Sequence, residues 1–358
     1  MASNNIGDDE EDEVYSSAMQ LANTTVLPMV MRAVLNLNVF EIINGASTVQ
    51  ISASEIASQL PNNRNPDAQA VLDRMLRVLV SHSVLTCSVV ADKESGQLQR
   101  LYGLTPPCKY FIKNQDGASL SPYFLGSVHK DILATWYGLE DAVLEGGVSS
   151  EKVNEMAEYE HIAMDPKLES LFNTSMSDHS NIIMTKIMEK YKGFEGVEVV
   201  VDIGGGNGTS INLIVSKYPT IKGINFDLPH VVAKAPSYPG VEHVGGDMFV
   251  SVPKGDVIFM KWVLHNWDDE HCLRLLKKCY EALPKGGKVI VIEGILPRVP
   301  NLDNATKNML ALDMLMMVSF GAKERTKEEF EALAKGSGFI GIRLPCNAYD
   351  LWIMEFLK

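Results

Sequence analysis

The chain has 358 residues, of which 46% are hydrophobic, and its net charge is −13. This length is sufficient for two domains, since one hydrophobic core rarely grows beyond roughly 250–300 residues. No apolar run approaches the roughly 20 residues of a membrane-spanning helix, and a strongly acidic chain is poorly suited to bind nucleic-acid phosphates. The polar, acidic N-terminus does not resemble a signal peptide. We therefore expect a cytoplasmic protein whose partners include neither a membrane nor a nucleic acid.

The five cysteines are an odd number and form no C-x-x-C pair, so we expect free thiols. Cys272 and Cys279 are seven residues apart on a predicted helix and could share one face. No further ligand cluster lies near them in the sequence, and no metal site is predicted.

The sequence predicts an N-terminal tail and then a long apolar helix. Residues 8–13 are six consecutive acids, so residues 1–14 are expected to form a disordered acidic tail. Residues 15–43 would give a helix that is apolar nearly all round. Such a helix must be buried on several sides, either in a core or against a second subunit.

Two shorter helices and a β-hairpin follow. Helices followed by a hairpin are typical of a winged helix, which suggests either DNA binding or a dimerisation or lid domain. Residues 1–118 hold 13 acids against 8 bases and no basic stripe, so we favour a mainly helical, winged-helix-like dimerisation domain over residues 15–118. The helices are predicted at 54–60 and 67–80 and the strands at 84–90 and 97–104, with a turn-rich stretch between the strands.

Residues 119–358 are predicted to form a second, larger domain. Residues 119–192 have a helical pattern throughout. From Val197 onward, short apolar segments alternate with amphipathic helices, which predicts a doubly wound parallel sheet that is covered on both faces. The expected strands are 197–202, 222–227, 241–245, 256–261 and 288–293.

A glycine-rich turn follows the first of these strands. Glycines at 204, 206 and 208 let the backbone approach a ligand closely and expose its amide donors. A dinucleotide fingerprint requires a further glycine where this chain has Thr209. The spacing therefore favours a nucleoside ligand without a pyrophosphate, with a nicotinamide-dependent oxidoreductase as the alternative from another class.

Two further loops carry groups that suit a nucleoside. Asp227 ends the next strand about 20 residues after the glycine turn, where a carboxylate can accept both ribose hydroxyls, unless it only caps a helix. Asp247 could accept a hydrogen bond from an exocyclic amine. Met248 and Phe249 beside it could form the apolar walls of an adenine pocket, although a plain loop can have the same composition.

Catalytic groups are predicted at the same edge of the sheet. Lys261 ends a buried strand, where an unpaired charge is costly, and His265 follows on the adjoining loop. Open α/β sheets bind ligands at the carboxyl ends of their strands, so His265 is a candidate general base and not only a structural histidine. A base histidine needs a carboxylate that fixes its tautomer. Glu293 is the better placed of two candidates, and Glu324 could instead be a capping or surface acid.

Taken with these residues, the chain resembles the plant caffeic acid O-methyltransferase family, and the likeness runs nearly end to end. It is carried by LPM at 27–29, LYGL at 101–104, MSDHS at 176–180, YKGFE at 191–195, DIGGG at 202–206, GINFDLPH at 223–230, VEHVGGDMF at 241–249 and KERT at 323–326.

The resemblance implies a homodimer with a class I methyltransferase fold, which uses S-adenosyl-L-methionine and no metal. In that family the positions matching Gly204, Asp227, Asp247, Met248 and Lys261 contact the methyl donor. The position matching His265 removes the acceptor proton, those matching Glu293 and Glu324 flank the histidine, and the one matching Met176 lies against the acceptor ring.

Three departures from the family pattern fall on the acceptor side. Asn266, in the run HNW at 265–267, replaces a usual aspartate, Gly126 and Ser127 replace a Met-Asn pair, and the loop 317–323 is one residue shorter. We expect Asn266 and Trp267 to bind the acceptor together with the apolar residues Met176, Leu312 and Met316.

The predicted reaction is an in-line displacement in which His265 deprotonates a phenolic hydroxyl as its oxygen takes the methyl group. Methionine-rich walls adapt to varied shapes. The expected acceptor is therefore a phenylpropanoid, lignan, benzylisoquinoline alkaloid or flavonoid, with a caffeate- or 5-hydroxyferulate-type lignin precursor as the alternative.

Overall fold

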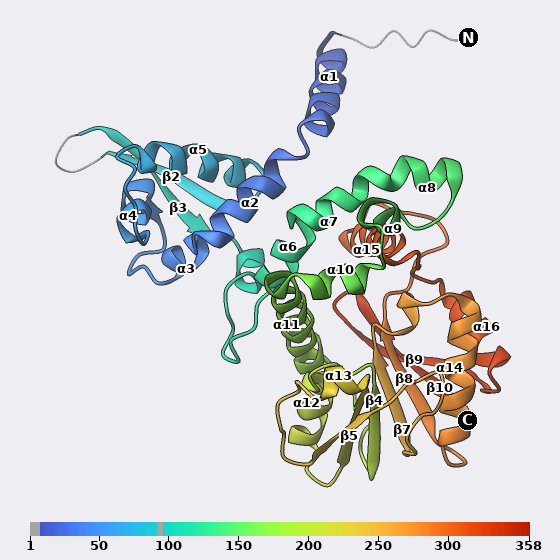
Figure 1. Cartoon of the computed structure of the whole chain (residues 1–358). Coiled ribbons are helices and arrows are strands. Elements are labelled where there is room, and N and C mark those ends of the chain that lie inside the picture. The colour runs from blue at the N-terminus through green and yellow to red at the C-terminus, as the bar shows by residue number, and fades with distance from the viewer. Residues whose placement is uncertain (1–7, 92–95) are drawn as a thin grey trace. The chain divides into compact units, whose positions relative to one another are not determined.

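A computed structural model describes residues 8–91 and 96–358 of the chain. These residues form two compact units, which divide between His129 and Lys130 (Figure 1). The sequence analysis placed the division after residue 118. The boundary lies later because the helix α6 (Ser121–Ser127) packs on α2 (Val26–Asn36) within the first unit.

The first unit is mainly helical with one small sheet. Its three strands are antiparallel in the order β1-β3-β2, and its helices lie before β1, between β1 and β2, and after β3. Apart from α2 and α6, its elements are α1 (Asp8–Ala22), α3 (Val39–Asn44), β1 (Ile51–Ser52), α4 (Ala53–Gln59), α5 (Ala68–Ser81), β2 (Leu85–Ala91), β3 (Leu98–Leu104) and the 3-10 helix η1 (Pro106–Tyr110).

The predicted single helix over residues 15–43 is wrong, because the chain breaks into α1, α2 and α3. At the first break, the Asn23 side chain donates to the Met19 carbonyl at 2.9 Å and the Thr24 hydroxyl donates to the Leu21 carbonyl at 3.0 Å. These side chains compete with the backbone for the carbonyls that would continue the helix.

The predicted disordered tail is also wrong for residues 8–14, which belong to α1. Acidic side chains in a first helical turn are stabilised by the positive end of the helix dipole. Residues 1–7 lie outside the described residues.

A local hydrogen-bond pattern and one apolar core hold the rest of the first unit together. Ser52 caps α4, since its hydroxyl accepts from the Glu55 N–H at 3.2 Å while the Glu55 carboxylate accepts from the Ser52 N–H at 2.7 Å. The two predicted strands form the β2–β3 hairpin, in which Leu85 pairs with Leu104. Residues 92–95, in the connection between the strands, lie outside the described residues. Tyr102 on β3 is fully buried in the core.

The second unit begins with a helical region, which the sequence predicted as helical throughout. The region is in fact divided into separate segments, with glycines at 146 and 147 in the left-handed backbone region after the third segment. The segments are α7 (Lys130–Thr135), the 3-10 helix η2 (Trp136–Gly138), α8 (Leu139–Glu145), α9 (Ser149–Asn154), α10 (Glu158–Met164) and α11 (Pro166–Lys190).

A seven-stranded sheet forms the centre of the second unit, in the order β6-β5-β4-β7-β8-β10-β9. The five predicted strands are present and parallel, whereas β9 and β10 were missed by the sequence analysis, and β10 is antiparallel to both of its neighbours. The strands are β4 (Val199–Ile203), β5 (Lys222–Asp227), β6 (Val241–Gly245), β7 (Val257–Lys261), β8 (Lys288–Glu293), β9 (Gly341–Ala348) and β10 (Leu351–Leu357).

Helices cover both faces of this sheet (Figure 1). On β7, Val257 and Phe259 pack with α11, α12 and α15, whereas Ile258 and Met260 pack with α14 and α16 on the opposite face. This alternation explains why the central strands are apolar at most positions, on both faces. The helices are α12 (Thr209–Lys217), α13 (Pro229–Val232), η3 (Leu264–Asn266), α14 (Asp269–Ala282), α15 (Asn304–Phe320) and α16 (Lys327–Gly336).

Within the described part of the chain, no helix has the combined length and apolar character needed to cross a membrane.

Candidate active site

Four charged residues gather where parallel strands of the second unit end. Asp202, Asp227, Lys261 and Glu293 lie at or next to the carboxyl ends of β4, β5, β7 and β8. The strand order reverses beside β4, which pairs with β5 on one side and with β7 on the other. Open α/β sheets bind their ligands at such a switch point, as the sequence analysis expected.

The glycine turn between β4 and α12 has the backbone that the sequence predicted. Gly204 has a φ of 65° and Gly206 a φ of 57°, both in the left-handed region that side chains disfavour. A Cβ on Gly204 would meet Val263 at 3.0 Å, whereas one on Gly206 would meet nothing within 4 Å. The turn therefore borders open space at Gly206.

Asp227 binds this turn directly. Its Oδ2 accepts from the Gly206 N–H at 2.8 Å, and its Oδ1 accepts from the Leu228 N–H at 2.7 Å. Each carboxylate oxygen can accept a further hydrogen bond. Asp227 thus both shapes the turn and keeps acceptor capacity for a ligand hydroxyl.

Asp202 and Lys261 form an ionisable floor beside the turn. Asp202 is buried, its Oδ2 has no hydrogen-bond partner, and burial together with the Asp227 carboxylate raises its pKa well above the ordinary value. Burial lowers the pKa of Lys261 to about 7, against the opposing effect of Asp202 and Glu293. A buried carboxylate oxygen without a partner is costly, so this floor suits a polar or cationic ligand group.

The loop after β6 reaches the same edge. The Gly246 N–H donates to the Asp227 carbonyl at 2.9 Å. This hydrogen bond brings the loop of Asp247, Met248 and Phe249 close to Asp227. Asp247 accepts from the Phe249 N–H at 2.8 Å, so one of its oxygens also stabilises the loop.

His265 lies on η3, a single 3-10 turn that follows β7, and its side chain is buried. Its Nδ1 hydrogen-bonds the Glu324 carboxylate at 2.7 Å. A neutral histidine in this contact donates its Nδ1 proton to the carboxylate, which leaves Nε2 with the lone pair that a base requires. The geometry can therefore accept a proton at Nε2 and stabilise the resulting charge.

The two carboxylates have different tasks from those that sequence logic favoured. Glu293 was expected to be the ring partner, but its Oε1 instead accepts from the N–H groups of Val263, Leu264 and His265 at 3.0, 2.6 and 3.3 Å. Glu324, which could have been a surface acid, is buried and binds the ring. The loop after α15 brings Glu324 back to η3. This path could not be predicted from the sequence, because Glu324 does not lie at the end of a strand.

An aromatic stack beside His265 was missed by the sequence analysis. Trp262 stacks on His179 with ring centroids 4.0 Å apart and lies nearly parallel to His265 at 5.8 Å. Trp262 has a φ of 55°, unusual for a bulky residue, and the Lys261 ammonium lies over its ring at 4.0 Å. Burial and Lys261 hold the pKa of His179 well below its usual range, so His179 is neutral. The motif MSDHS at 176–180 contained the only available signal for His179.

Asn225 and Arg325 were also missed. Asn225 is fully buried on β5 and donates to the Gly206 carbonyl at 2.9 Å, which supports the glycine turn from below. Arg325 is fully buried and contacts the loop that carries His265. Both residues lie inside quoted motifs, but nothing in their spacing indicates these contacts.

The predicted acceptor residues do not all lie together. Leu312 and Met316 on α15 are buried on the same face of the sheet as Trp262, and Asn266 donates to the Trp262 carbonyl at 3.0 Å. The Trp267 ring instead packs against Phe249 at 4.7 Å, among the residues of the opposite face. A tight turn sends consecutive side chains in different directions, which separates Trp267 from the others. Met176 lies on α11, one turn before His179.

Within residues 8–91 and 96–358, no group of three or more histidine, cysteine or acidic side chains is arranged to hold a metal ion. The donor set at the strand ends suits an organic cofactor better. Open space at Gly206, the Asp227 acceptors and the partnerless Asp202 oxygen accommodate a ligand with hydroxyl and cationic groups. These residues are compatible with S-adenosylmethionine.

Comparison with known families matches both units. The family model of the O-methyltransferase domain matches residues 136–340, and the model of the O-methyltransferase dimerisation domain matches residues 19–114. The first match covers the five parallel strands of the sheet, η3 and Glu324, and the second covers most of the N-terminal unit.

Similar proteins extend over nearly the whole chain. The caffeic acid 3-O-methyltransferase of Medicago sativa is 56% identical, with 98% of this chain and 95% of the relative covered. That of Capsicum annuum is 54% identical, with 97% of each chain covered. Human N-acetylserotonin methyltransferase, solved with S-adenosylmethionine, has the same fold at 20% identity, with a TM-score of 0.79 and coverage of 100% and 99%. The chain therefore belongs to the plant caffeic acid O-methyltransferase family and is an S-adenosylmethionine-dependent O-methyltransferase.

Proposed function

We propose that this enzyme methylates a phenolic hydroxyl of a plant specialised metabolite, with His265 as the general base. The observation that carries the proposal is the buried contact between His265 Nδ1 and Glu324 at 2.7 Å. The names of the similar plant enzymes support a phenolic acceptor, since caffeic acid is a catechol.

The base lowers the cost of creating a phenolate. A phenol has a pKa of about 10 and an imidazolium about 6.5, so complete proton transfer before attack would be uphill by roughly 5 kcal/mol. His265 removes the proton as the acceptor oxygen attacks, and Glu324 stabilises the imidazolium that forms. S-adenosylmethionine, when bound, supplies an electrophilic methyl group on a sulfonium.

The methyl-donor site comprises the strand-end residues of the sheet. Asp227 accepts from the ribose hydroxyls, and the glycine turn at Gly204 lets the ligand approach the backbone. Asp247, Met248 and Phe249 hold the adenine, and Lys261 contributes a donor on the same floor.

The acceptor site lies toward α15. Leu312 and Met316 form its apolar wall, Met176 approaches it from α11, and Asn266 presents an amide where the family commonly has an aspartate. Asn266 also lies 3.5 Å from the Tyr159 hydroxyl, whose ring packs against Phe320. We expect these residues to influence which phenol is accepted.

A panel of phenols tests this function. We would incubate the purified enzyme with methyl-labelled donor and phenylpropanoids, lignans, benzylisoquinoline alkaloids, flavonoids, caffeate and 5-hydroxyferulate. Mass spectrometry and NMR would then locate the methyl group. The proposal expects an O-methylated phenol, and caffeate or 5-hydroxyferulate as the best acceptor would favour the lignin-pathway alternative. Transfer to a nitrogen or carbon, or to no phenol, would contradict it.

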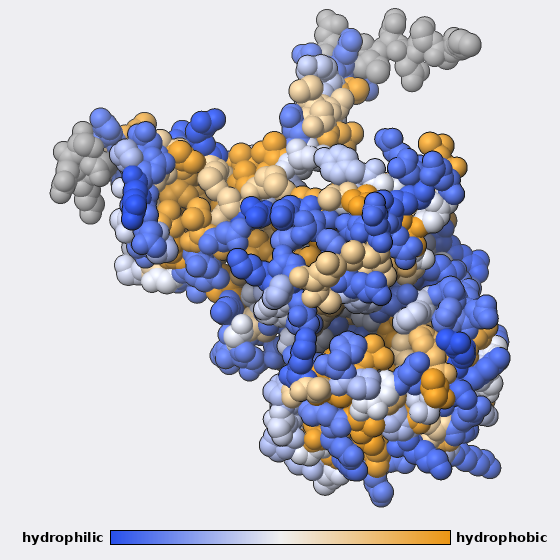
Figure 2. Space-filling model, in the orientation of Figure 1, coloured by the Kyte–Doolittle hydropathy of each residue, from blue (hydrophilic) through white to orange (hydrophobic). Residues whose placement is uncertain are grey.

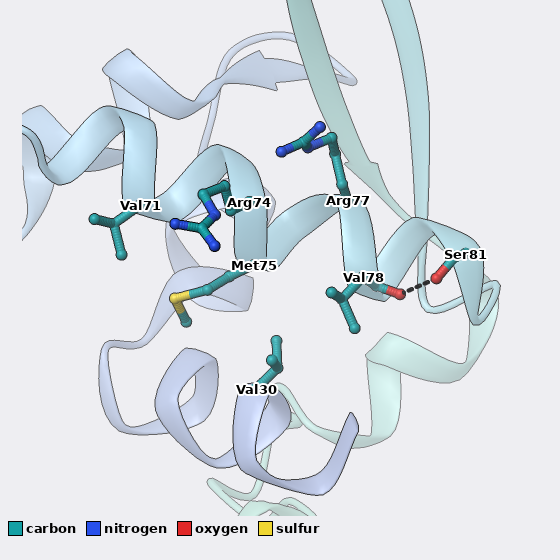
Figure 3. Close-up of a pocket in the computed structure, with 7 residues that line it drawn as sticks. All are labelled: Val30, Val71, Arg74, Met75, Arg77, Val78 and Ser81. Carbon is teal, nitrogen blue, oxygen red and sulfur yellow. Dashed lines mark hydrogen bonds between the residues drawn. The ribbon is translucent and has the colours of Figure 1, made fainter. Parts of the chain in front are cut away.

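We further propose that the N-terminal unit forms a homodimer. Figure 2 shows hydrophobic residues on the surface of this unit. On α1, the side chains of Tyr15 and Leu21 are 66% and 74% exposed. Between α2 and α5 lies a shallow pocket of about 490 Å³, where Val30, Met75 and Val78 point toward one another (Figure 3). The match to a dimerisation domain over residues 19–114 supports a second copy of the chain as the occupant of these surfaces.

Light scattering tests the dimer. One chain has a mass of 39.5 kDa, so light scattering should give twice that mass for the dimer. Val71→Glu places a charge beside the pocket and should favour the monomer, whereas Val89→Glu on β2 is the matched control, because Val89 is similarly exposed outside the pocket. A monomeric wild-type protein at micromolar concentration would refute the dimer.

A further inference from the structure

The Arg325 side chain is completely buried, and its N–H groups donate hydrogen bonds to the loop that carries His265. Its guanidinium donates to the Leu264 carbonyl at 2.8 Å and to the Trp267 carbonyl at 2.7 Å. Both Nε and one terminal nitrogen also donate to Asp269 Oδ1, at 2.9 and 2.8 Å. A planar guanidinium can make several such bonds at once in a fixed geometry, which an ammonium cannot.

The two carbonyls bracket the base. Leu264 and Trp267 are the residues on either side of His265 and Asn266, and η3 itself contributes only short-range bonds such as Trp267 N–H to the Leu264 carbonyl at 3.2 Å. A single 3-10 turn has weak hydrogen-bond geometry and does not hold its position unaided. Its placement must come from outside the turn.

Outside contacts hold both polar ends of this turn. Glu293 accepts from the N–H groups of Val263, Leu264 and His265, whereas Arg325 donates to the carbonyls. A buried carboxylate and a buried guanidinium thus clamp opposite ends of the same turn.

The segment that carries Arg325 is itself fixed. The Glu324 N–H donates to Asp313 Oδ1 at 2.8 Å, and the Arg325 carbonyl accepts from the Leu296 N–H at 2.9 Å. Two consecutive residues of one anchored segment therefore act on His265. Glu324 binds its ring, and Arg325 binds the backbone of the turn on which His265 lies.

We propose that Arg325 is a positioning residue for methyl transfer, which fixes the turn of His265 so that its Nε2 faces the acceptor oxygen. The proposal rests on the proposed role of His265 as the base. Arg325 touches neither substrate in this assignment and acts through the backbone of the turn. A base misplaced by about 1 Å can lose about a hundredfold in rate, so loss of the clamp should appear in turnover.

Two variants separate the clamp from the ion pair. Arg325→Lys keeps the positive charge but cannot hold both carbonyls together. Asp269→Asn keeps an oxygen that accepts from Arg325 while it removes the charge, and it leaves both carbonyl contacts intact. If the clamp is what matters, only the first variant should be impaired.

The readouts are turnover and backbone hydrogen exchange. With an acceptor from the phenol panel, Arg325→Lys should lower kcat by roughly 10- to 100-fold. Its affinity for S-adenosylhomocysteine should stay within about threefold of wild type. Hydrogen exchange followed by mass spectrometry should become faster over residues 262–268 and not across β4 or α12. Asp269→Asn should match wild type within about twofold in every readout.

Wild-type turnover and exchange in Arg325→Lys would overturn the proposal. The proposal would also be overturned if turnover and the affinity for S-adenosylhomocysteine fell equally and hydrogen exchange became faster throughout the second unit. Such a result would indicate a purely structural role for Arg325. If the lysine variant does not fold, Arg325→Gln, which also shortens the side chain and removes the guanidinium, replaces it with the same expected losses and the same contradicting results. If the enzyme methylates no phenol, the proposed function fails, and the exchange data still decide whether Arg325 holds the turn.

Discussion

Lys261 shows how single residues are tuned at the strand ends. It ends β7 near the carboxylates of Asp202 and Glu293, and burial lowers its pKa from 10.5 to about 7 in spite of them. Because the unfolded chain keeps the higher pKa, it binds a proton between these two values that the folded chain lacks. Stability should therefore rise with pH across this window.

Lys261→Met tests this balance. In the absence of the methyl donor, the variant should unfold with a higher free energy than wild type at pH 6.5, by about 1–3 kcal/mol. The difference should shrink as the pH rises from 7 toward 10.5, because the wild-type protein gains stability across that window. Urea titrations at several pH values would measure it, with the exposed Lys254→Met as the control. A difference that grows with pH would contradict the shifted pKa.

Asn266 is the residue at which acceptor choice is expected to change. Its amide nitrogen donates to the Trp262 carbonyl at 3.0 Å, a contact that an ionised aspartate cannot make. Asn266→Asp should therefore change KM for the acceptor or the order of preferred acceptors, with donor affinity within about twofold. Steady-state kinetics on two acceptors would show this. An unchanged acceptor profile would remove Asn266 from the acceptor site.

At the level of elements, the glycine turn between β4 and α12 joins the sheet to the proposed methyl-donor site. A Cβ on Gly205 would lie 2.1 Å from Asn225 Oδ1 and 2.9 Å from Asp202 Oδ2. Asn225 holds the Gly206 carbonyl, so a displaced Asn225 would move the turn that Asp227 also binds.

Gly205→Ala should accordingly weaken binding of S-adenosylhomocysteine by at least about tenfold, since such overpacking commonly costs about 1–3 kcal/mol. Titration calorimetry would measure the affinity. Gly341→Ala is the matched control, because a Cβ there meets nothing within 4 Å. Equal affinities in both variants would show that the turn tolerates displacement.

Sequence patterns predicted these elements unequally, for physical reasons. β5, β6 and β8 were predicted at their observed bounds, because buried parallel strands are short apolar runs between turn residues. β9 was missed because it is partly exposed and contains Pro345, and β10 is its hairpin partner.

For the candidate site, the sequence predicted the positions of residues that lie at or just after the ends of parallel strands. Asp227, Lys261 and His265 gather at one edge because parallel strands end there. The partner of the His265 ring could not be predicted, because Glu324 is 59 residues away and reaches it by the return path of a loop. Trp267 was misplaced for a similar reason, since residue spacing does not give the direction of a side chain in a tight turn.

At the level of the whole molecule, two units divide the work. The unit up to His129 matches a dimerisation domain, and the unit from Lys130 carries the sheet with His265 and its carboxylates. In the proposed chemistry His265 supplies the base, and no metal is expected to take part. The predicted cytoplasmic location stays a prediction.

Metal independence gives a direct test at this scale. Activity should be unchanged after exhaustive dialysis against EDTA and should not rise when Mg²⁺ is added. Methyl transfer to one acceptor would be followed before and after dialysis, with metal content measured in parallel. Loss of activity that Mg²⁺ restores would show that a metal, and not His265 alone, activates the hydroxyl.

His265, held by Glu324, is the proposed base of the O-methyl transfer. His265→Gln removes the base and keeps a polar side chain of similar size, so its turnover is the most direct measurement. We expect kcat to fall by about 10²–10⁴-fold, while the affinity for S-adenosylhomocysteine stays within about threefold of wild type. Turnover close to that of wild type, or a loss that is matched by lost donor affinity, would contradict it.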